Sequence, residues 1–590
     1  MHKQKESERK LAMQLLLHAA APEKKHLIWG LIYLLIASCL EAIGPILGKA
    51  LIDHYLLPHR LEMAMMVFLL LGFLVTGWCA TVLRYLQLTR LAGVAMRSVF
   101  RLRERVFAHV LRLPMAFFDR AMTGHLVSRI TNDTEAVKNL YVQVLFVMLD
   151  SSLVVLGALL AMAVLQWRLM LIVLMLVPAV ILIVWFYQRW SAPAVARARQ
   201  KRSEINAQVA ESIYGMSSLQ ACNAQVKFGA RFERINQDHY AARVDELRVN
   251  AFLLRPALDL LNVLLLIIVI FVFGEGKTSA VEVGILYAFV SYIARVVEPL
   301  IQITMQFGQI QQAVIAAARV NTLLQEAALE RPENSHEISR GELHFEGLQF
   351  AYAPEQWVIQ DFNLQIPAGA FYAIVGATGS GKSSLLSLLL RFYTAQSGQI
   401  KIDDLALADL SEAQFRASVG LVPQEPFLLA ASARDNIAMG RELSEDALIA
   451  AAKAAHAHDF IMQMEHGYDT YLGEGGTKLS TGQKQLIAIA RALAASVKIL
   501  LLDEATSHID SETEQIVQLA LNELRGKVTI VSIAHRLSTI RQADQIVVLQ
   551  HGRIAEQGSH LELMEKSGGV YQKLYLLQSM STQFESNSLA

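Results

Sequence analysis

The stretch YAIVGATGSGKSSLL, residues 372–386, determines how the second half of this chain folds. It contains the pattern Gly-x-x-x-x-Gly-Lys-Ser, from Gly376 to Ser383, after an apolar segment and before a helical one. A strand, a glycine-rich loop and a helix in this order form a phosphate-binding loop. Backbone N–H groups of such a loop surround phosphates, and the helix N-terminus adds partial positive charge. The sequence therefore predicts a nucleotide-binding domain around this loop.

The side chains of the loop have distinct expected roles. Lys382 is expected to reach the β- and γ-phosphates of ATP, and Ser383 is expected to ligate Mg²⁺. A chance match without nucleotide is disfavoured by the flanking strand and helix. The predicted ATP-binding residues of the loop are Gly376, Ala377, Thr378, Gly379, Ser380, Gly381, Lys382, Ser383 and Ser384.

A second motif, KILLLDEATSHID at residues 498–510, combines a buried strand with two acidic residues. Asp503 at the strand end suits the Mg²⁺ shell, through water. Glu504 follows directly and is the candidate base that polarises the attacking water. An acidic pair that caps a helix is the alternative. The phosphate-binding loop in the same chain favours the catalytic interpretation.

The chain as a whole is too apolar for an ordinary soluble protein. Of the 590 residues, 54% are hydrophobic and 18% are charged, and the mean hydropathy is +0.35. A bilayer span needs about 20 mostly apolar residues. Six stretches meet this condition, at residues 27–49, 63–83, 142–165, 169–189, 257–274 and 281–305. The predicted fold is an all-α transmembrane domain of six helices fused to an α/β phosphate-loop domain with a largely parallel sheet.

Charge and composition give the domain boundaries and the orientation. Basic residues concentrate in the two long loops after the second and fourth spans, and positive charge stays on the cytoplasmic side. Both termini and the α/β half are therefore expected in the cytoplasm. The formal net charge is zero, which suggests no nucleic-acid partner. The expected parts are a cytoplasmic segment at 1–25, a transmembrane domain at 26–322, a linker at 323–341, a nucleotide-binding domain at 342–580 and a polar tail at 581–590.

Further motifs resemble the nucleotide-binding domain of ABC (ATP-binding cassette) transporters. Gln424 in VPQEPFL, His535 in SIAHRLSTI and Tyr352 in FAY match the residues that sense Mg²⁺, contact the γ-phosphate and stack on adenine. The family's signature loop, which acts on the partner's ATP, matches Leu479, Ser480, Thr481, Gly482 and Gln483. The D-loop matches Ser507, His508, Ile509 and Asp510, with histidine in place of the usual alanine. The resemblance covers the whole C-terminal half. It implies ATP and Mg²⁺ as cofactors, with Glu504, His535 and Gln424 catalytic and with Ser383, Gln424 and Asp503 around the metal.

The membrane half is similar to half-size exporters of this family, of type IV. Residues 117–137 and 211–221 resemble the two coupling-helix regions, and the chain as a whole resembles the multidrug-resistance-like half-transporters of enteric bacteria. The resemblance implies ATP-driven export across the bacterial inner membrane by alternating access. It also implies a dimer, because each ATP lies between one phosphate-binding loop and the partner's signature. A heterodimer with a second half-transporter is favoured over a homodimer.

Thr481 departs from the family pattern, which has glycine at this position. Glycine allows the closest backbone approach, whereas a β-branched residue adds bulk and restricts φ and ψ. One interpretation is a tolerated variant, since Ser480 and Gly482 remain. The other is an asymmetric dimer, in which Glu504 serves an active site and the altered signature serves a weaker one.

Ionisable groups inside the spans are costly, about 2.5–3.5 kcal/mol each at the bilayer centre, and are therefore functional candidates. Helix–helix pairing is the simpler explanation for each. The other is a cavity that accepts small hydrophobic or amphiphilic, preferably cationic, drugs. The candidate cavity residues are Glu41, Asp150, Asp259, Arg295 and Glu298.

Two other functions fit parts of the sequence. A lipid or lipid-linked-glycan flippase would use the same ATPase, and the sequence does not distinguish its cargo from drugs. A soluble or chromosomal ATPase also carries a phosphate-binding loop and a signature, but six apolar spans argue against it. A substrate-capture importer is disfavoured, because the membrane and nucleotide parts are fused in exporter order.

Overall fold

The computed structural model describes residues 21–60, 62–253, 255–275, 283–329, 338–495, 497–503, 511–534, 536–577 and 579. The chain divides into two compact units. The first, called the helical unit, comprises Met1–Arg112 and Ala121–Ala327. The second, called the sheet unit, comprises Leu113–Arg120 and Ala328–Ala590. The short segment Leu113–Arg120 therefore belongs with the C-terminal half, although it lies between two helices of the N-terminal half.

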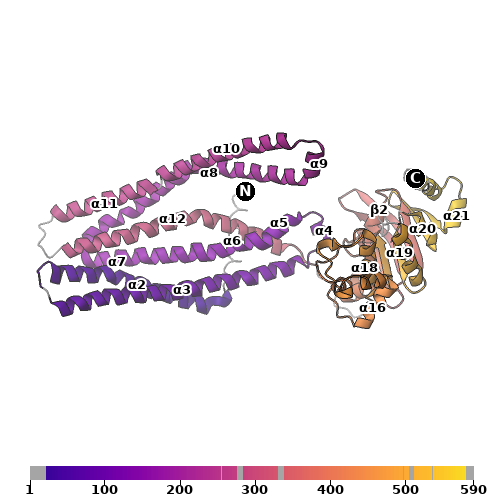
Figure 1. The fold of residues 1–590 in the computed structure, drawn as a ribbon, viewed down its shortest axis with the longest axis horizontal. Coiled ribbons are helices and arrows are strands. Elements are labelled where there is room, and N and C mark those ends of the chain that lie inside the picture. Colours follow the sequence, from indigo (N-terminus) through magenta and orange to yellow (C-terminus); the bar gives the residue numbers. More distant parts are fainter. Residues whose placement is uncertain are drawn as a thin grey trace. The chain divides into compact units, whose positions relative to one another are not determined.

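Long helices build the helical unit (Figure 1). They are α2 (Lys24–Leu51), α3 (Met63–Val110), α7 (Phe146–Leu174), α8 (Leu176–Tyr214), α10 (Gln225–Leu253), α11 (Arg255–Glu275) and α12 (Val283–Gln325). Within α7 the backbone of Gln166 is non-helical, with φ −161° and ψ 101°, so the helix is interrupted there. This interruption separates the third and fourth apolar stretches of the sequence.

Several helical runs of the described residues have the length and composition needed to cross a membrane. Four long ones are Ala21–Leu56, Met63–Val110, Thr123–Tyr214 and Val283–Gln306, and Pro256–Val272 is a shorter apolar helix. The run Thr123–Tyr214 contains both α7 and α8. The expected spans fall within these runs, apart from residues 281 and 282, which lie outside the described residues, and two C-terminal residues of the fifth span, which fall in α11.

Short helical elements connect the long ones. They are η1 (Ala21–Glu23), η2 (Ile52–Leu56), α4 (Met115–Phe118), α5 (Thr123–Ser128), η3 (Arg129–Asp133), α6 (Thr134–Asn139), η4 (Leu140–Leu145) and α9 (Met216–Ala221). Three of them, η2, η3 and η4, are π-helical. Such wide turns are rare and occur frequently at functional positions in helices.

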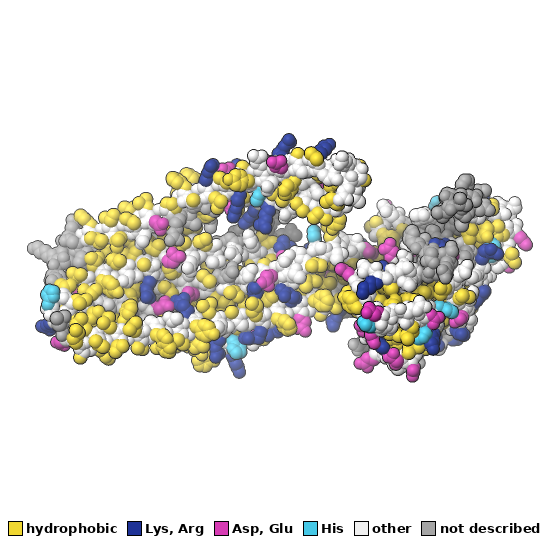
Figure 2. Space-filling model, in the orientation of Figure 1, with side chains coloured by type: hydrophobic (Ala, Val, Ile, Leu, Met, Phe, Trp, Pro, Cys, Tyr) yellow, Lys and Arg dark blue, Asp and Glu magenta, His cyan; other side chains and the backbone are white. Residues whose placement is uncertain are grey.

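Apolar side chains lie both inside the helical unit and on its surface. A buried cluster that includes Met162, Phe289 and Tyr292 packs α7, α8, α11 and α12 together. Other large apolar residues such as Trp78 and Val164 are exposed. Figure 2 shows hydrophobic side chains over most of the visible surface of this unit. Because a helix satisfies its own backbone hydrogen bonds, such a surface is stable in lipid.

The sheet unit contains two sheets. One has the order β2–β1–β4–β5 and is antiparallel; its strands are β1 (Leu343–Ala351), β2 (Trp357–Ile366), β4 (Ser397–Ile402) and β5 (Leu405–Ala406). The other has the order β10–β9–β3–β8–β7–β6 and is parallel except for β10. Its strands are β3 (Phe371–Gly376), β6 (Val419–Val422), β7 (Ile499–Asp503), β8 (Thr529–Ile533), β9 (Gln545–Gln550) and β10 (Arg553–Gly558).

Apolar clusters on the two faces of the parallel sheet form the core of this unit. Its strands are almost continuously buried, as expected for parallel strands covered on both faces. The helices are α13 (Lys382–Leu389), α14 (Glu412–Ser418), α15 (Ala433–Ala438), α16 (Glu445–Ala454), α17 (His458–Met462), α18 (Thr481–Leu493), α19 (Ser511–Leu524), α20 (Leu537–Gln542) and α21 (His560–Glu565). The short 3₁₀ turns are η6 (Leu407–Asp409), η7 (Gly467–Asp469) and η8 (Glu474–Gly476).

Candidate nucleotide site and membrane charge cluster

The carboxyl ends of four adjacent parallel strands carry the predicted catalytic motifs. The register pairs Ile374 of β3 with Ile533 of β8, and Ile533 with Asp503 of β7. Val422 of β6 pairs with Leu502, one residue before Asp503. The phosphate-binding loop, Asp503 and the segment that contains Gln424 therefore leave the sheet at one edge, where ligands bind in open α/β sheets.

The backbone of the phosphate-binding loop requires glycine at its two ends. At Gly376 an added Cβ would lie 2.4 Å from the carbonyl oxygen of Leu549. Gly381 has a φ of 106° and is the N-cap of α13. A left-handed conformation at that position suits glycine alone. The loop therefore places the first N–H groups of α13, which have no partner inside the helix, at the sheet edge.

Lys382 and Tyr352 are both in contact with the loop. The Lys382 Nζ donates to the carbonyl oxygens of Gly376 at 2.8 Å and Ala377 at 3.1 Å, and its side chain is buried. Tyr352 follows β1, has 47% of its surface exposed, and donates a hydrogen bond to Ser384 at 3.1 Å. An ammonium beside helix N–H groups and an exposed ring one residue past a strand can bind a phosphate chain and stack on a base.

Acidic and polar residues at the ends of the adjacent strands β7 and β6 add possible metal ligands to this site. Asp503 is half-buried at the end of β7, and Gln424 is exposed beyond β6. Together with the exposed Ser383 they offer a carboxylate, an amide and a hydroxyl oxygen, the hard ligands that Mg²⁺ prefers. The predicted base Glu504, the D-loop at 507–510 and His535 lie outside the described residues.

The predicted signature loop forms the start of α18. Ser480 is the N-cap, and its hydroxyl accepts from the N–H of Gln483 at 3.2 Å while the Gln483 side chain accepts from the N–H of Ser480 at 3.1 Å. Thr481 is the first residue of α18 and is exposed. Helical backbone geometry is open to every L-residue, so Thr481 imposes no backbone strain. What it adds over glycine is bulk and a hydroxyl group.

Arg491, at the other end of α18, is a residue that the motifs did not identify. Its guanidinium donates to the carbonyl oxygens of Asn436 at 2.8 Å and Phe427 at 2.9 Å. Burial lowers the pKa of Arg491. Phe427 lies in the same segment as Gln424, so Arg491 ties the signature helix to that segment. The available sequence signal was a single arginine within the otherwise apolar stretch LIAIARALAA at residues 486–495.

Tyr393 is a second residue that motif reading missed. Its hydroxyl donates to the carboxylate of Asp119, and its ring lies edge-on to Tyr352 with 5.0 Å between centroids. Burial, followed by the hydrogen bond to Asp119, raises the pKa of Tyr393 to about 12. The hydroxyl group therefore stays protonated and donates at any physiological pH. Asp119 belongs to the segment Leu113–Arg120, so this contact attaches that segment to the sheet unit.

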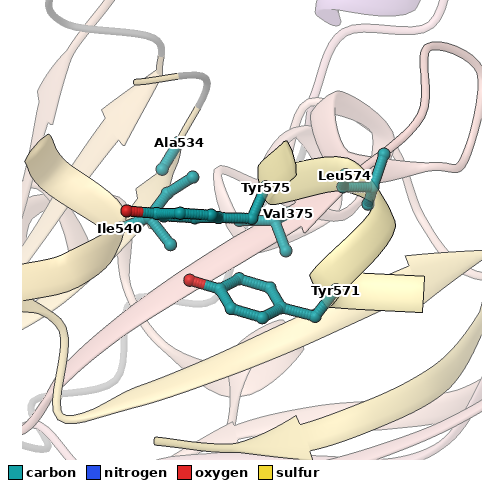
Figure 3. Close-up of a pocket in the computed structure, with 7 residues that line it drawn as sticks. Val375, Ala534, Ile540, Tyr571, Leu574 and Tyr575 are labelled. Atoms are coloured by element: carbon teal, nitrogen blue, oxygen red, sulfur yellow. The ribbon is translucent and has the colours of Figure 1, made fainter. Parts of the chain in front are cut away.

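A small pocket borders the start of the phosphate-binding loop, at Val375 and Gly376 (Figure 3). Tyr571 and Tyr575, from the helical residues 570–577, line it together with Val375 and Ala534. Its volume of about 20 Å³ admits one water molecule and no nucleotide. Because Val375 directly precedes Gly376, the helical residues 570–577 lie beside the end of the strand that carries the loop.

Three of the five candidate cavity residues form one charge cluster in the helical unit. Arg84 donates to both carboxylate oxygens of Glu41 at 3.0 Å, and to Asp150 at 2.6 Å. Arg295 lies 4.0 Å from the carboxylate of Glu41. Asp259 and Glu298 occupy exposed positions of α11 and α12. Arg84 directly follows the second expected span, 63–83. Its side chain pairs with the two carboxylates from within α3, which continues beyond the apolar stretch.

Arg295 also donates a hydrogen bond to a backbone carbonyl of α2 that lacks its usual helical partner. In a helix the carbonyl of Glu41 would accept from the N–H four residues later, but that residue is Pro45, which has none. The Arg295 Nη1 donates to this carbonyl at 2.7 Å instead, and the hydroxyl of Tyr292 donates to the carbonyl of Ala42. Two side chains of α12 thus satisfy carbonyls of α2 beside its proline.

Comparison with known protein families gives two matches along the chain. Residues 27–300 match the family model of the ABC transporter transmembrane region. Residues 359–507 match the family model described as ABC transporter.

Individual relatives align over almost the whole chain. The multidrug resistance-like ATP-binding protein MdlB of Buchnera aphidicola subsp. Schizaphis graminum is 37% identical over 560 residues, 95% of this chain and 96% of its own. A fatty acid ABC transporter ATP-binding/permease protein of Mycobacterium bovis is 34% identical over 540 residues, 91% of this chain and 84% of its own. The solved structure of a bacterial Atm1-family ABC exporter with ATP bound has a TM-score of 0.78 and 28% identity, and covers 94% of this chain and 98% of its own.

Proposed function

This chain belongs to the ABC exporters, which couple ATP hydrolysis to transport through a membrane, and we propose that it exports hydrophobic or amphiphilic drugs as one half of a heterodimer. The proposed location is the bacterial inner membrane, with the sheet unit and both termini in the cytoplasm. The name of the MdlB relative supports the choice of cargo. The basic residues after the second and fourth spans support the orientation.

The common sheet edge and the resemblance to ABC transporters support the proposed roles in ATP binding and hydrolysis. Tyr352 stacks on adenine and the residues from Gly376 to Ser384 hold the phosphates, with Lys382 at the β- and γ-phosphates. Ser383, Gln424 and Asp503 would hold Mg²⁺, which when bound neutralises the phosphate charge. Glu504 orients and polarises the attacking water, and His535 contacts the γ-phosphate.

The second subunit supplies what one chain lacks. One phosphate-binding loop and one signature cannot form a complete ATP sandwich, so we infer at least a dimer. ATP favours the closed dimer because its γ-phosphate contacts both subunits, and hydrolysis removes that preference. Residues 479–483 act on the partner's ATP.

Thr481 supports the heterodimer over the homodimer. In a homodimer the threonine would narrow both ATP sites, whereas in a heterodimer it affects one. We infer that Glu504 serves an active site completed by the partner's signature. The altered signature of this chain then serves a weaker site.

The observation that carries the ATPase proposal is the alignment of β3, β8, β7 and β6, whose ends bring the motifs together. Replacement of Glu504 by Gln tests it in the purified two-subunit complex. We expect ATP turnover to fall by about 100-fold or more, within the range of general base catalysis. ATP binding should persist in this variant. Substantial hydrolysis in the E504Q complex would refute the assignment.

A lipid flippase is the second candidate, because a relative named for fatty acid transport is 34% identical to this chain.

The charge cluster of the helical unit also affects which compounds the chain can be expected to export. Glu41 and Asp150 are matched by Arg84 and Arg295, so the cluster gives no special preference for cations. Uptake of a lipophilic dye into inverted vesicles, compared with movement of a fluorescent fatty acid, distinguishes the two. ATP-dependent uptake of ethidium supports drug export, and movement of the fatty acid alone would replace it with lipid transport.

A further inference from the structure

An ion pair in the helical unit joins two segments that are distant in sequence. The guanidinium of Arg319, on α12, donates from Nε to Asp133 at 2.9 Å and from Nη2 to the other carboxylate oxygen at 2.6 Å. The Asp133 side chain is only 8% exposed, whereas that of Arg319 is 53% exposed. A two-point contact of this kind fixes both distance and orientation.

Arg319 balances the negative charge of Asp133, because the neighbouring charged side chains pair with one another. The neighbouring acid, Glu135, is already paired with Lys138 and lies 3.5 Å from Arg103. Arg103 also donates to the hydroxyl of Thr134 at 3.3 Å. Asp133 itself ends the π-helical turn η3, whose wide geometry shifts the following residues around the helix axis.

Each partner of this pair lies near one end of a connection to the sheet unit. The chain enters the helical unit from Leu113–Arg120 at Ala121, and is helical from Thr123 through η3 to Asp133. It leaves the helical unit after α12, which carries Arg319, at Ala327. The segment Leu113–Arg120 is in turn bound to the sheet unit through Asp119 and Tyr393.

The helix that carries Arg319 is well packed around this contact. Ala316, Ala317, Val320 and Leu323 are all buried, and α12 packs against both η3 and α6. A displacement of either connection therefore acts on a rigid, close-packed pair of segments and not on a loose loop.

We propose that Asp133 and Arg319 are positioning residues for coupling. Their ion pair makes the two connections to the ATPase move as one body, so that ATP-driven movement reaches the membrane helices. Without the pair, apolar packing alone holds the connection through residues 113–133 against the connection through α12, and the two no longer keep a fixed orientation when one of them moves. ATP is then hydrolysed without the full change in the helical unit. This inference concerns coupling and holds whichever compound is exported.

The test measures conformation and ATP turnover separately, in the purified two-subunit complex in lipid nanodiscs. Nitroxide labels are placed at Met63 and Val283, the exposed first residues of α3 and α12, after Cys39, Cys79 and Cys222 are replaced. The distance distribution between the labels is recorded with and without ATP and vanadate. The variants are Asp133→Asn, Arg319→Gln and the exchanged pair Asp133→Arg with Arg319→Asp.

We expect ATP and vanadate to shift the distribution in the unsubstituted protein. Both single variants should weaken this shift by about 5-fold or more in the equilibrium between states, the lower end of allosteric coupling. Trapped nucleotide and ATP turnover should stay close to the unsubstituted values. The exchanged pair should recover the shift. If a single variant does not assemble, Arg319→Lys keeps the charge, loses the two-point contact and should give an intermediate shift.

Arg243→Ala is the matched control. It removes an arginine whose partner, Glu246, lies at 2.5 Å in the same helix α10, so no two segments are separated. It should leave the shift intact. The proposal is overturned if Asp133→Asn and Arg319→Gln shift as fully as the control. It is also overturned if they lose turnover and conformational change together.

Discussion

The positive charge of Arg84 compensates the negative charges of two carboxylates inside the helical unit. Both acids, Glu41 and Asp150, bond directly to it, and all three side chains are about one-quarter exposed. Loss of one partner of a buried ion pair costs about 3–5 kcal/mol, and partial exposure reduces that cost. We therefore expect Arg84→Ala to lower the free energy of unfolding by about 2 kcal/mol. Thermal unfolding of the detergent-solubilised protein measures this change.

Arg105→Ala provides the comparison, since Arg105 is an exposed residue of the same helix α3. Its replacement should change stability by less than about 0.5 kcal/mol, as surface substitutions do. Equal stability of the R84A and R105A proteins would show that the carboxylates do not depend on Arg84.

Arg491 leads to a second prediction at the residue scale. Its guanidinium links α18 to the segment that contains Phe427 and Asn436, because it donates hydrogen bonds to the backbone carbonyls of both residues. Arg491→Met keeps the apolar stem and removes the donors, so the carbonyl of the buried Asn436 and the carbonyl of the exposed Phe427 both lose their partner. We expect a loss of about 2 kcal/mol, given about 1–3 for an unsatisfied buried polar group. Unfolding monitored by intrinsic fluorescence measures it, and an unchanged midpoint would contradict the assignment.

At the scale of elements, the N-caps of α18 and α16 allow an effect on helix stability to be distinguished from an effect on ATP turnover. Ser480 and Ser444 are both N-caps whose side chains accept from a backbone N–H of the first turn. Replacing either by Ala should cost about 1 kcal/mol. Because Ser480 is the proposed contact to the partner's ATP, only Ser480→Ala should also reduce ATP turnover of the complex. Equal turnover in the S480A and S444A complexes would place α18 away from the nucleotide.

The elements also show which features the sequence predicts. Long apolar runs and the strand–loop–helix around residue 376 were recognisable, because hydrophobic periodicity and glycine placement are local properties. The π-helical turns and the interruption at Gln166 carry no local sequence signal. The pairing of Arg84 and of Arg295 carries no local signal either, because their partners lie on other helices, although the sequence does mark Arg295 as an ionisable residue within a span. The motifs identified residues for the nucleotide site, whereas the contacts of Tyr393 and Arg491 depend on tertiary packing.

For the whole molecule, the division into two units limits how ATP can act on the membrane helices. The units are joined by residues 112–113, 120–121 and 327–328. The covalent routes for coupling within one chain are therefore the segment 113–120 and the end of α12. Tyr393 holds the first of these routes, and the Asp133–Arg319 pair links both.

The dimer itself gives the last prediction. If each ATP site needs the signature of a second subunit, turnover per chain falls on dilution, because monomers hold only incomplete sites. Reconstitution with a half-transporter that has glycine at the position of Thr481 should raise the turnover per chain at the same total protein concentration. ATPase assays over a dilution series, with mass photometry of the same samples, measure both quantities. An isolated monomer with the turnover of the complex would exclude the shared site, since one chain would then supply every contact that hydrolysis needs.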